Sequence, residues 1–150
     1  MDEVKITKLE KYDEKSAAEM GRLLTFVSRR YDGRPLSKEW IEKIIESPNH
    51  DQLLAYDGDK LVGMATMSLL FVPSKGLNSY LHDMVVDGSC QGKGVGSKLW
   101  VAVVEWGREK GAGRLEFTAA GNSDKKAKAL EFWLRKGAKV RDTNFFRLEL

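Results

Sequence analysis

Apolar residues recur at two spacings along the first fifty residues, and these spacings predict one strand followed by two helices. Val4 to Leu9 alternate weakly with polar residues, which is typical of a strand. Apolar residues every three or four positions predict a helix over about 13–29 and a second, shorter helix after Ser37. Ser37 is suited to be the N-cap of that helix, and Pro48 is expected to end it.

The middle of the chain contains the clearest hairpin signal. Residues 51–56 and 61–71 are two apolar runs, and the turn sequence Asp57-Gly58-Asp59 lies between them. A loop with Pro73 and Gly76 separates this hairpin from a further strand over 80–86. Three consecutive strands are therefore expected before the next helix.

Helices and strands are predicted to alternate in the last third of the chain. A helix is expected over about 95–110, a short strand over 114–118, and a helix over 124–136 that Gly137 stops. Val140 and residues 145–150 are expected to close the chain as strands. The order β-α-α-β-β-β-α-β-α-β-β predicts an α/β (α+β) fold, in which a mixed sheet of about seven strands is flanked by four helices.

Composition agrees with one globular domain, which we expect to span residues 1–150. The chain is 42% hydrophobic and 31% charged, unlike a disordered sequence. Its net charge of +3 is too small to indicate a nucleic-acid partner. No apolar run approaches the roughly 20 residues of a membrane span, and the charged amino terminus does not resemble a secretory signal. We therefore expect a cytoplasmic protein without a membrane partner.

Cysteine and histidine are scarce, which limits the chemistry that the chain can perform. One cysteine excludes an internal disulfide and a cysteine-based zinc site, and two histidines cannot form a histidine-rich metal site, so no metal is expected. Cys90 has no identifiable histidine and acid partner, and we interpret it as an incidental thiol.

The strongest chemical signal is a glycine-rich turn between the strand ending near residue 86 and the helix beginning near 95. Glycines at 92, 94 and 96 let backbone N–H groups converge, and the helix N-terminus attracts phosphate. Ser97 stands where a nucleotide-triphosphate loop or a dinucleotide fingerprint requires glycine, so neither pattern fits. What remains is Gln-x-x-Gly-x-Gly over residues 91–96; a plain tight connection is the alternative interpretation.

This motif, between its strand and helix, resembles the acetyl-CoA pyrophosphate loop of the GCN5-related N-acetyltransferase (GNAT) superfamily, in its small single-domain prokaryotic form. The resemblance extends to residues 81–87, 129–138 and 141–148 and is strong from about residue 52 onward. It implies a mostly antiparallel, twisted sheet. It also implies an acetyl-CoA-dependent N-acetyltransferase that moves an acetyl group to a primary amine by direct attack in a ternary complex.

The resemblance further implies which residues hold acetyl-CoA. Backbone groups of the central strand are expected to bind the acetyl-pantetheine arm, loop amides the pyrophosphate, and a polar side chain after the next strand the pantetheine. The implied cofactor-binding residues are Met84, Val85, Val86, Gln91, Gly92, Lys93, Gly94, Val95, Gly96, Ser97 and Asn122. For Asn122, an ordinary loop or cap asparagine is the alternative.

The catalytic residues are expected on the central strand, where alternation places Tyr80, His82 and Met84 on one face. His82 is the expected general base because an unperturbed histidine pKa of about 6.5 lies near working pH; an ordinary surface or core histidine is the alternative. Tyr80 is expected to line the acceptor pocket or relay a proton. Trp133 occupies the position at which the family usually has a tyrosine that protonates the CoA thiolate. A catalytically silent acetyl-CoA-binding regulatory or sensor module therefore stays an alternative hypothesis.

The resemblance places acceptor selection in residues 29–36 and 71–78. Arg29, Arg30, Arg34 and Lys75 make these segments basic, which favours an acceptor that also carries a carboxylate or phosphate, or is simply solvated surface. The expected partner is a small-molecule or peptide amine. A homodimer is compatible with the resemblance, because many members dimerise.

Overall fold

The structure of the protein is a computed structural model that describes residues 3–28, 30–119 and 124–150. The chain divides into two compact units, Met1–Phe117 and Thr118–Leu150. The first unit contains the sheet and three of the helices, and the second contains the last helix and the carboxyl-terminal residues.

In the first unit, the strands are β1 (Lys5–Lys8), β2 (His50–Asp57), β3 (Lys60–Val72), β4 (Gly76–Val86) and β5 (Leu115–Phe117), and the helices are α1 (Glu14–Leu24), α2 (Lys38–Glu46) and α3 (Val95–Glu109). The five strands form one sheet in the order β1-β2-β3-β4-β5. Neighbours from β1 to β4 are antiparallel, and β5 is parallel to β4. The predicted mixed, mostly antiparallel sheet is confirmed.

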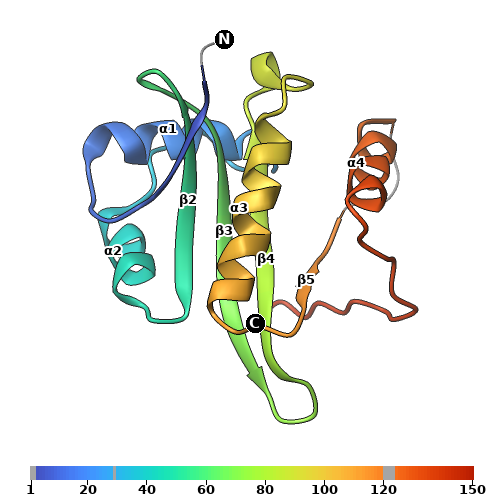
Figure 1. Cartoon of the computed structure of the whole chain (residues 1–150). Coiled ribbons are helices and arrows are strands. Elements are labelled where there is room, and N and C mark those ends of the chain that lie inside the picture. The colour runs from blue at the N-terminus through green and yellow to red at the C-terminus, as the bar shows by residue number, and fades with distance from the viewer. Residues whose placement is uncertain (1–2, 29, 120–123) are drawn as a thin grey trace. The chain divides into compact units, whose positions relative to one another are not determined.

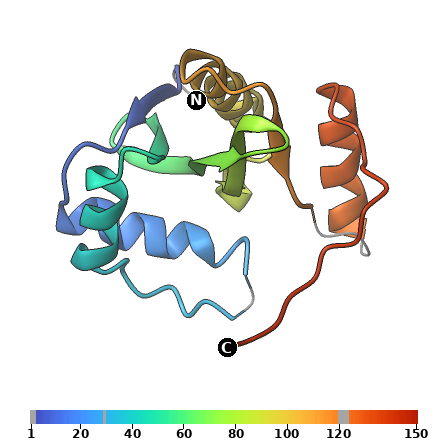
Figure 2. The ribbon, with the colours of Figure 1, turned by 90° about the horizontal axis from the view of Figure 1, so that it is seen from below.

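The helices of the first unit pack on both faces of the sheet. α3 lies against β3 and β4 on one face, and α1 and α2 lie on the other (Figures 1 and 2). The core under α1 and α2 contains the fully buried side chains of Met20, Leu23, Ile41 and Leu61. Met20, Leu23 and Ile41 come from the apolar stripes that predict the two helices, and Leu61 comes from β3. The periodicity of the two stripes is therefore explained by burial against the sheet.

Side-chain caps determine where α1 and α2 begin. Asp13 accepts a hydrogen bond from the N–H of Ser16 (2.8 Å), and Ser37 accepts one from the N–H of Trp40 (3.1 Å). The predicted N-cap at Ser37 is confirmed. The first helix ends at Leu24 and not near residue 29, because the Thr25 N–H turns back to the carbonyl of Arg22.

The predicted hairpin is also confirmed, and its turn is tight. Asp57 pairs with Lys60, and Gly58 between them has a φ angle of +59°. A residue with a Cβ is strained in this left-handed region, which explains the glycine.

The second unit contains α4 (Asp124–Arg135), which ends as predicted at Gly137. Gly137 has a φ angle of +87°, and the N–H of Ala138 donates to the carbonyl of Trp133 (3.1 Å), a typical helix stop. The described residues from 139 to 150 form no strand, so the expected closing strands are wrong and the described sheet has five strands and not about seven. Alternating residues become a strand only when a partner strand takes up their backbone hydrogen bonds.

Candidate functional site

The glycine-rich segment connects a short 3-10 helix, Gly88–Cys90, to α3. Gly92 and Gly94 have φ angles of +79° and +86°, which only glycine adopts without strain. A Cβ built on either glycine would meet no described atom within 4 Å. Glycine is therefore required here by backbone conformation and not by crowding, and the space beside the loop is open.

The N-terminus of α3 presents backbone donors at the end of this loop. Gly94 is the N-cap, and no side chain of a described residue caps the helix. The first bond within the helix runs from the Lys98 N–H to the Gly94 carbonyl (3.1 Å), so the amides of residues 95–97 have no partner inside the helix. α3 is 15 residues long, and its dipole adds partial positive charge at this end. The arrangement is suited to bind a phosphate or diphosphate.

A glycine in β3 allows α3 to begin close to the sheet. A Cβ on Gly63 would lie 3.0 Å from the Leu99 side chain and 3.1 Å from both the Val85 carbonyl oxygen and the Val95 side chain. A larger residue would force the first turns of α3 away from β4. Gly63 therefore keeps the donor-bearing end of α3 beside the last residues of β4.

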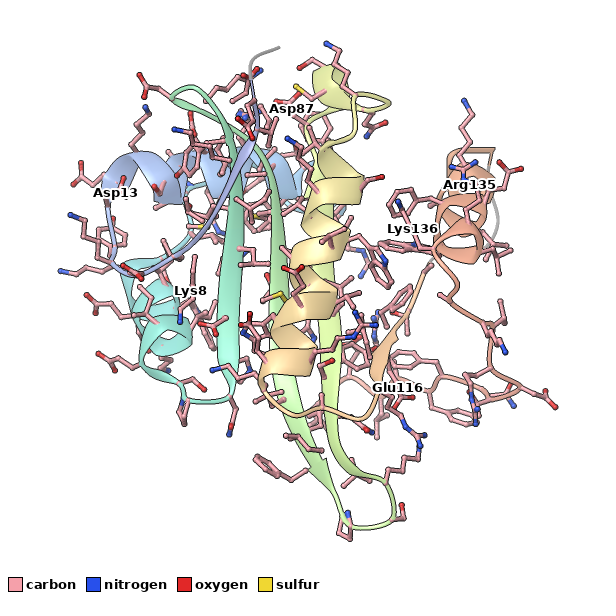
Figure 3. All side chains as sticks on the ribbon, viewed as in Figure 1. Lys8, Asp13, Asp87, Glu116, Arg135 and Lys136 are labelled. Atoms are coloured by element: carbon pink, nitrogen blue, oxygen red, sulfur yellow. The ribbon has the colours of Figure 1, made fainter. Side chains whose placement is uncertain are left out.

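Asp87 anchors the chain as it leaves β4 for the loop (Figure 3). Its backbone N–H donates to the Val62 carbonyl (2.8 Å), and its carboxylate accepts from the N–H (2.9 Å) and hydroxyl (2.7 Å) of Ser89. Arg22 and Lys60 form ion pairs with the same carboxylate. Burial raises the pKa of Asp87, but the hydrogen bonds from Ser89 and Arg22 and the charge of Lys60 outweigh it and hold the pKa far below 3.8.

One edge of β4 is open beside the loop. β4 pairs with β3 from Gly76 to Val86, but with β5 only at residues 79–81. Among the described residues, no strand covers the β5 side of β4 from residue 82 to 86. The Gln91 side-chain amide reaches the Val86 carbonyl in a long hydrogen bond of 3.5 Å. This edge is a place where an extended ligand with amide groups can add to the sheet.

A register shift in β4 changes which side chains share a face. Leu81 pairs with Met67, but Met84 pairs with Ala65, so one extra residue lies in β4 between the two pairs. Met84 therefore lies on the face of Leu81, and the prediction that it shares a face with Tyr80 and His82 is wrong. The alternation rule fails because a bulge inserts one residue without a partner. Tyr80 and His82 do share a face, as predicted.

His82 lies in a polar cluster on the face of the sheet that α1 and α2 cover elsewhere. Its Nε2 is 2.6 Å from the hydroxyl of Ser68, which is only 3% exposed. The rings of Tyr80 and His82 have centroids 4.8 Å apart. The His82 side chain is exposed, and within the described residues its Nδ1 has no hydrogen-bond partner.

The imidazole of His82 is only partly covered, and this partial burial lowers its pKa below 6.5. The nearby charge of Asp83 opposes this change, and that of His50 adds to it. The imidazole is therefore neutral at pH 7, which is the state a general base needs.

Two residues singled out in the sequence, Asn122 and Trp133, do not lie among the described residues of the first unit that form this site. Asn122 lies outside the described residues, and Trp133 lies in α4 of the second unit, where its ring packs on Phe132 with centroids 4.8 Å apart. In the described part of the chain, no three histidine, cysteine, aspartate or glutamate side chains are placed to hold a metal ion. No helix there is long and apolar enough to span a membrane.

The sequence pattern of the acetyltransferase (GNAT) family matches residues 18–137, which include the open strand, the glycine loop and α4. The chain belongs to the GNAT acetyltransferase family. This membership confirms the resemblance seen in the sequence and makes the protein an acyltransferase, in a family that generally uses acetyl-CoA and acts on amine acceptors.

Solved structures share the GNAT fold over nearly the whole chain. A transcriptional regulator from Bacillus halodurans C-125 superposes with a TM-score of 0.80 at 20% identity, covering 99% of this chain and 100% of its own. An aminoglycoside acetyltransferase from an uncultured soil metagenomic sample, in complex with trehalose, has a TM-score of 0.80 at 23% identity, covering 98% and 97%. A ribosomal-protein-alanine N-acetyltransferase from Brucella melitensis has a TM-score of 0.71 at 18% identity, covering 99% and 100%. Among curated proteins, none matches the sequence significantly.

Several residues that shape this GNAT site are not evident from the sequence. Gly63 is an isolated glycine in a strand, a signal of close backbone approach that sequence reasoning can use. Ser68 carries no comparable signal, because its role depends on a neighbour 14 residues away in the chain. The ion pair of Arg22 with Asp87 spans 65 residues and depends on the tertiary fold.

Proposed function

We propose that this GNAT acetyltransferase is one domain over residues 1–150 that transfers the acetyl group of acetyl-CoA to a primary amine by direct attack in a ternary complex. The observation that carries the proposal is the juxtaposition of uncapped α3 amides and an open edge of β4. A diphosphate needs convergent donors, and an amide-containing chain attached to it needs an extended partner. The two lie next to each other because Gly63 lets α3 pack closely.

The residues of the open edge and the loop fit acetyl-CoA, which supplies the thioester and its acetyl group. Backbone groups of Met84, Val85 and Val86 would hold the pantetheine arm, with the Gln91 side chain giving up its long bond to Val86. The amides of residues 91–97 would hold the diphosphate. The exposed side chain of Lys93 adds a positive charge at the loop.

His82 would act as the general base. An alkylamine has a pKa near 10.4 and must lose a proton before it attacks a carbonyl carbon. Because Nε2 is engaged with Ser68, the nitrogen that accepts the proton is Nδ1, and Nε2–H then donates to the Ser68 hydroxyl. Tyr80 packs on the imidazole and would line the path of the acceptor.

The acceptor is proposed to be a small molecule or a peptide amine. The fold relatives include an aminoglycoside acetyltransferase and a ribosomal-protein-alanine N-acetyltransferase, so the same fold accommodates both kinds of acceptor. A homodimer is compatible with the proposal.

The decisive experiment measures CoA binding and turnover separately. Calorimetry with CoA tests the loop, and thiol release from acetyl-CoA with a panel of amines, peptides and aminoglycosides tests transfer. We expect micromolar binding and turnover with at least one amine. CoA binding without turnover of any amine would instead favour a silent regulatory module, which the tryptophan at 133 supports because an indole N–H is not a useful acid.

A further inference from the structure

The face of β4 that carries His82 continues into two further polar side chains. Alternation along β4 places Asn78, Tyr80 and His82 on one face. Glu116 on β5 pairs with Tyr80 and therefore points to the same side. Figure 3 shows Glu116 on β5, in the lower half of the first unit.

Asn78 is buried with one polar atom unsatisfied. It is 2% exposed, and its Nδ2 donates to Oε1 of Glu116 at 3.2 Å. Within the described residues, its Oδ1 has no hydrogen-bond partner. Leaving a buried polar atom without a partner is costly, so such atoms in native proteins call for an explanation.

Glu116 has capacity for a further partner. The side chain is half-buried, and its carboxylate forms no ion pair with any described residue. An ionised carboxylate only accepts hydrogen bonds, as does an amide oxygen. Asn78 Oδ1 and the carboxylate of Glu116 together therefore offer acceptors and one negative charge. A ligand group that fits has several N–H donors and a positive charge, which describes an ammonium group.

We propose that Asn78 and Glu116 bind a second ammonium group of the acceptor, so that the favoured substrate is a diamine or polyamine. This inference rests on the proposed function. Asn78 lies four residues before His82, and at about 3.3 Å per residue the two positions are on the order of 13 Å apart. The amine at His82 loses a proton and is acetylated, while the distal amine stays charged and is held by Glu116. The aromatic ring of Tyr80 lies between the two and packs against the connecting chain.

The test compares diaminoalkanes of four to ten carbons with monoamines of the same length, by calorimetry on the CoA-loaded protein and by steady-state kinetics. We expect a diamine of eight to ten carbons to bind about tenfold to a hundredfold more tightly than its monoamine, the range for a hydrogen bond to a charged group. Glu116→Gln should remove this preference by raising KM for the diamine, and leave KM for the monoamine and kcat unchanged. Glu109→Gln, which removes the same charge at the exposed end of α3, is the matched control.

Equal binding of diamine and monoamine to the wild-type protein, or an unchanged preference in Glu116→Gln, would overturn the second ammonium site. Because binding is measured without turnover, this result is distinct from a failure of the transferase proposal, in which no amine would release thiol. Asn78→Ser provides a second variant, since it removes the unpartnered oxygen and keeps the Glu116 charge. It should weaken diamine binding by a smaller factor than Glu116→Gln.

Discussion

The guanidinium of Arg22 on α1 donates from Nη1 to Oδ2 of Asp87 at 2.6 Å, and this bond joins the helix to the segment that enters the glycine loop. Arg22 also donates from Nη2 to the Leu61 carbonyl (2.9 Å). Asp87 is 4% exposed, so its charge is stabilised by these neighbours and little by water. The position of the loop therefore depends on a residue from another part of the fold.

Arg22→Met should destabilise the protein, because it leaves the buried Asp87 carboxylate with one cation fewer. We expect a loss of about 2–3 kcal/mol in the free energy of unfolding, less than for a fully buried pair because Arg22 is partly exposed. Urea denaturation at pH 7 measures it. Arg34→Met is the matched control, since the Arg34–Asp32 pair is exposed on both sides and should contribute little to stability. Equal losses in both variants would contradict this account.

Low pH should reduce the free energy of unfolding, because it protonates the carboxylate of Asp87. The folded pKa of Asp87 lies below its ordinary value of 3.8, so its contribution to stability is present above pH 3.8 and is lost as the pH falls through the folded pKa. Asp87→Asn should therefore unfold more easily at pH 7, while the difference from wild type narrows toward about pH 2. Urea midpoints across this range test the prediction, and a constant difference at every pH would contradict it.

Substitutions at Gly94 separate backbone strain from charge. Gly94→Ala and Gly94→Asp both place a Cβ at a φ angle of +86°, so both should lose about 1–2 kcal/mol of stability. Only Gly94→Asp adds a negative charge at the predicted diphosphate position, and it should bind CoA at least about tenfold more weakly than Gly94→Ala. Calorimetry gives both dissociation constants. Equal values would show that the diphosphate binds elsewhere.

The acid side of the pH–rate profile should report His82. Because its pKa is lowered from 6.5, the imidazole is already neutral at pH 7, and kcat/KM should fall only below pH 6.5 as Nδ1 becomes protonated. His82→Ala should lower kcat by about 10²–10⁴-fold and abolish this dependence. The charge of His50 lowers the same pKa, so His50→Asn should move the acid limb toward higher pH. A His82→Ala enzyme with the wild-type profile would exclude His82 as the base.

Ser68 should act on the reaction through His82. Ser68→Ala removes the hydroxyl that holds Nε2, and we expect kcat to fall by about fivefold with KM unchanged, since a hydrogen bond of about 1 kcal/mol orients the ring. Ser68→Thr restores a hydroxyl and should recover much of the rate. Nitrogen NMR of His82 provides the independent measurement: the Nε2–H tautomer should dominate in the wild type and lose that dominance in Ser68→Ala. An unchanged tautomer ratio would argue against this role.

The sequence predicts most of the fold because local rules dominate it. The stripe containing Met20 and Leu23, the cap at Ser37 and the turn at Gly58 all act within a few residues, and each is confirmed. The closing strands fail because a strand requires a partner, which alternation at Phe146 and Leu148 does not supply; both side chains are exposed.

Prediction of the site also succeeds where the signal is local in the sequence and fails where it depends on the tertiary fold. The loop at Gly92 and Gly94 is evident because its glycines, its strand and its helix are adjacent in the sequence. The sheet face on which Met84 lies is mispredicted, because no feature of the neighbouring sequence indicates the bulge in β4. Contacts such as Ser68 with His82 depend on strand register, which only the folded sheet determines.

The uncovered edge of β4 has a consequence for the lifetime of the protein. A backbone edge without a neighbour is where foreign extended chains attach and where aggregates begin. A coenzyme that binds along this edge covers it in the way that a neighbouring strand would. At a free concentration one hundred times its dissociation constant, the coenzyme would add about 2.7 kcal/mol to the stability of the folded state. The supply of its own substrate would then determine how long each molecule of this enzyme survives in the cell, as well as how fast it works.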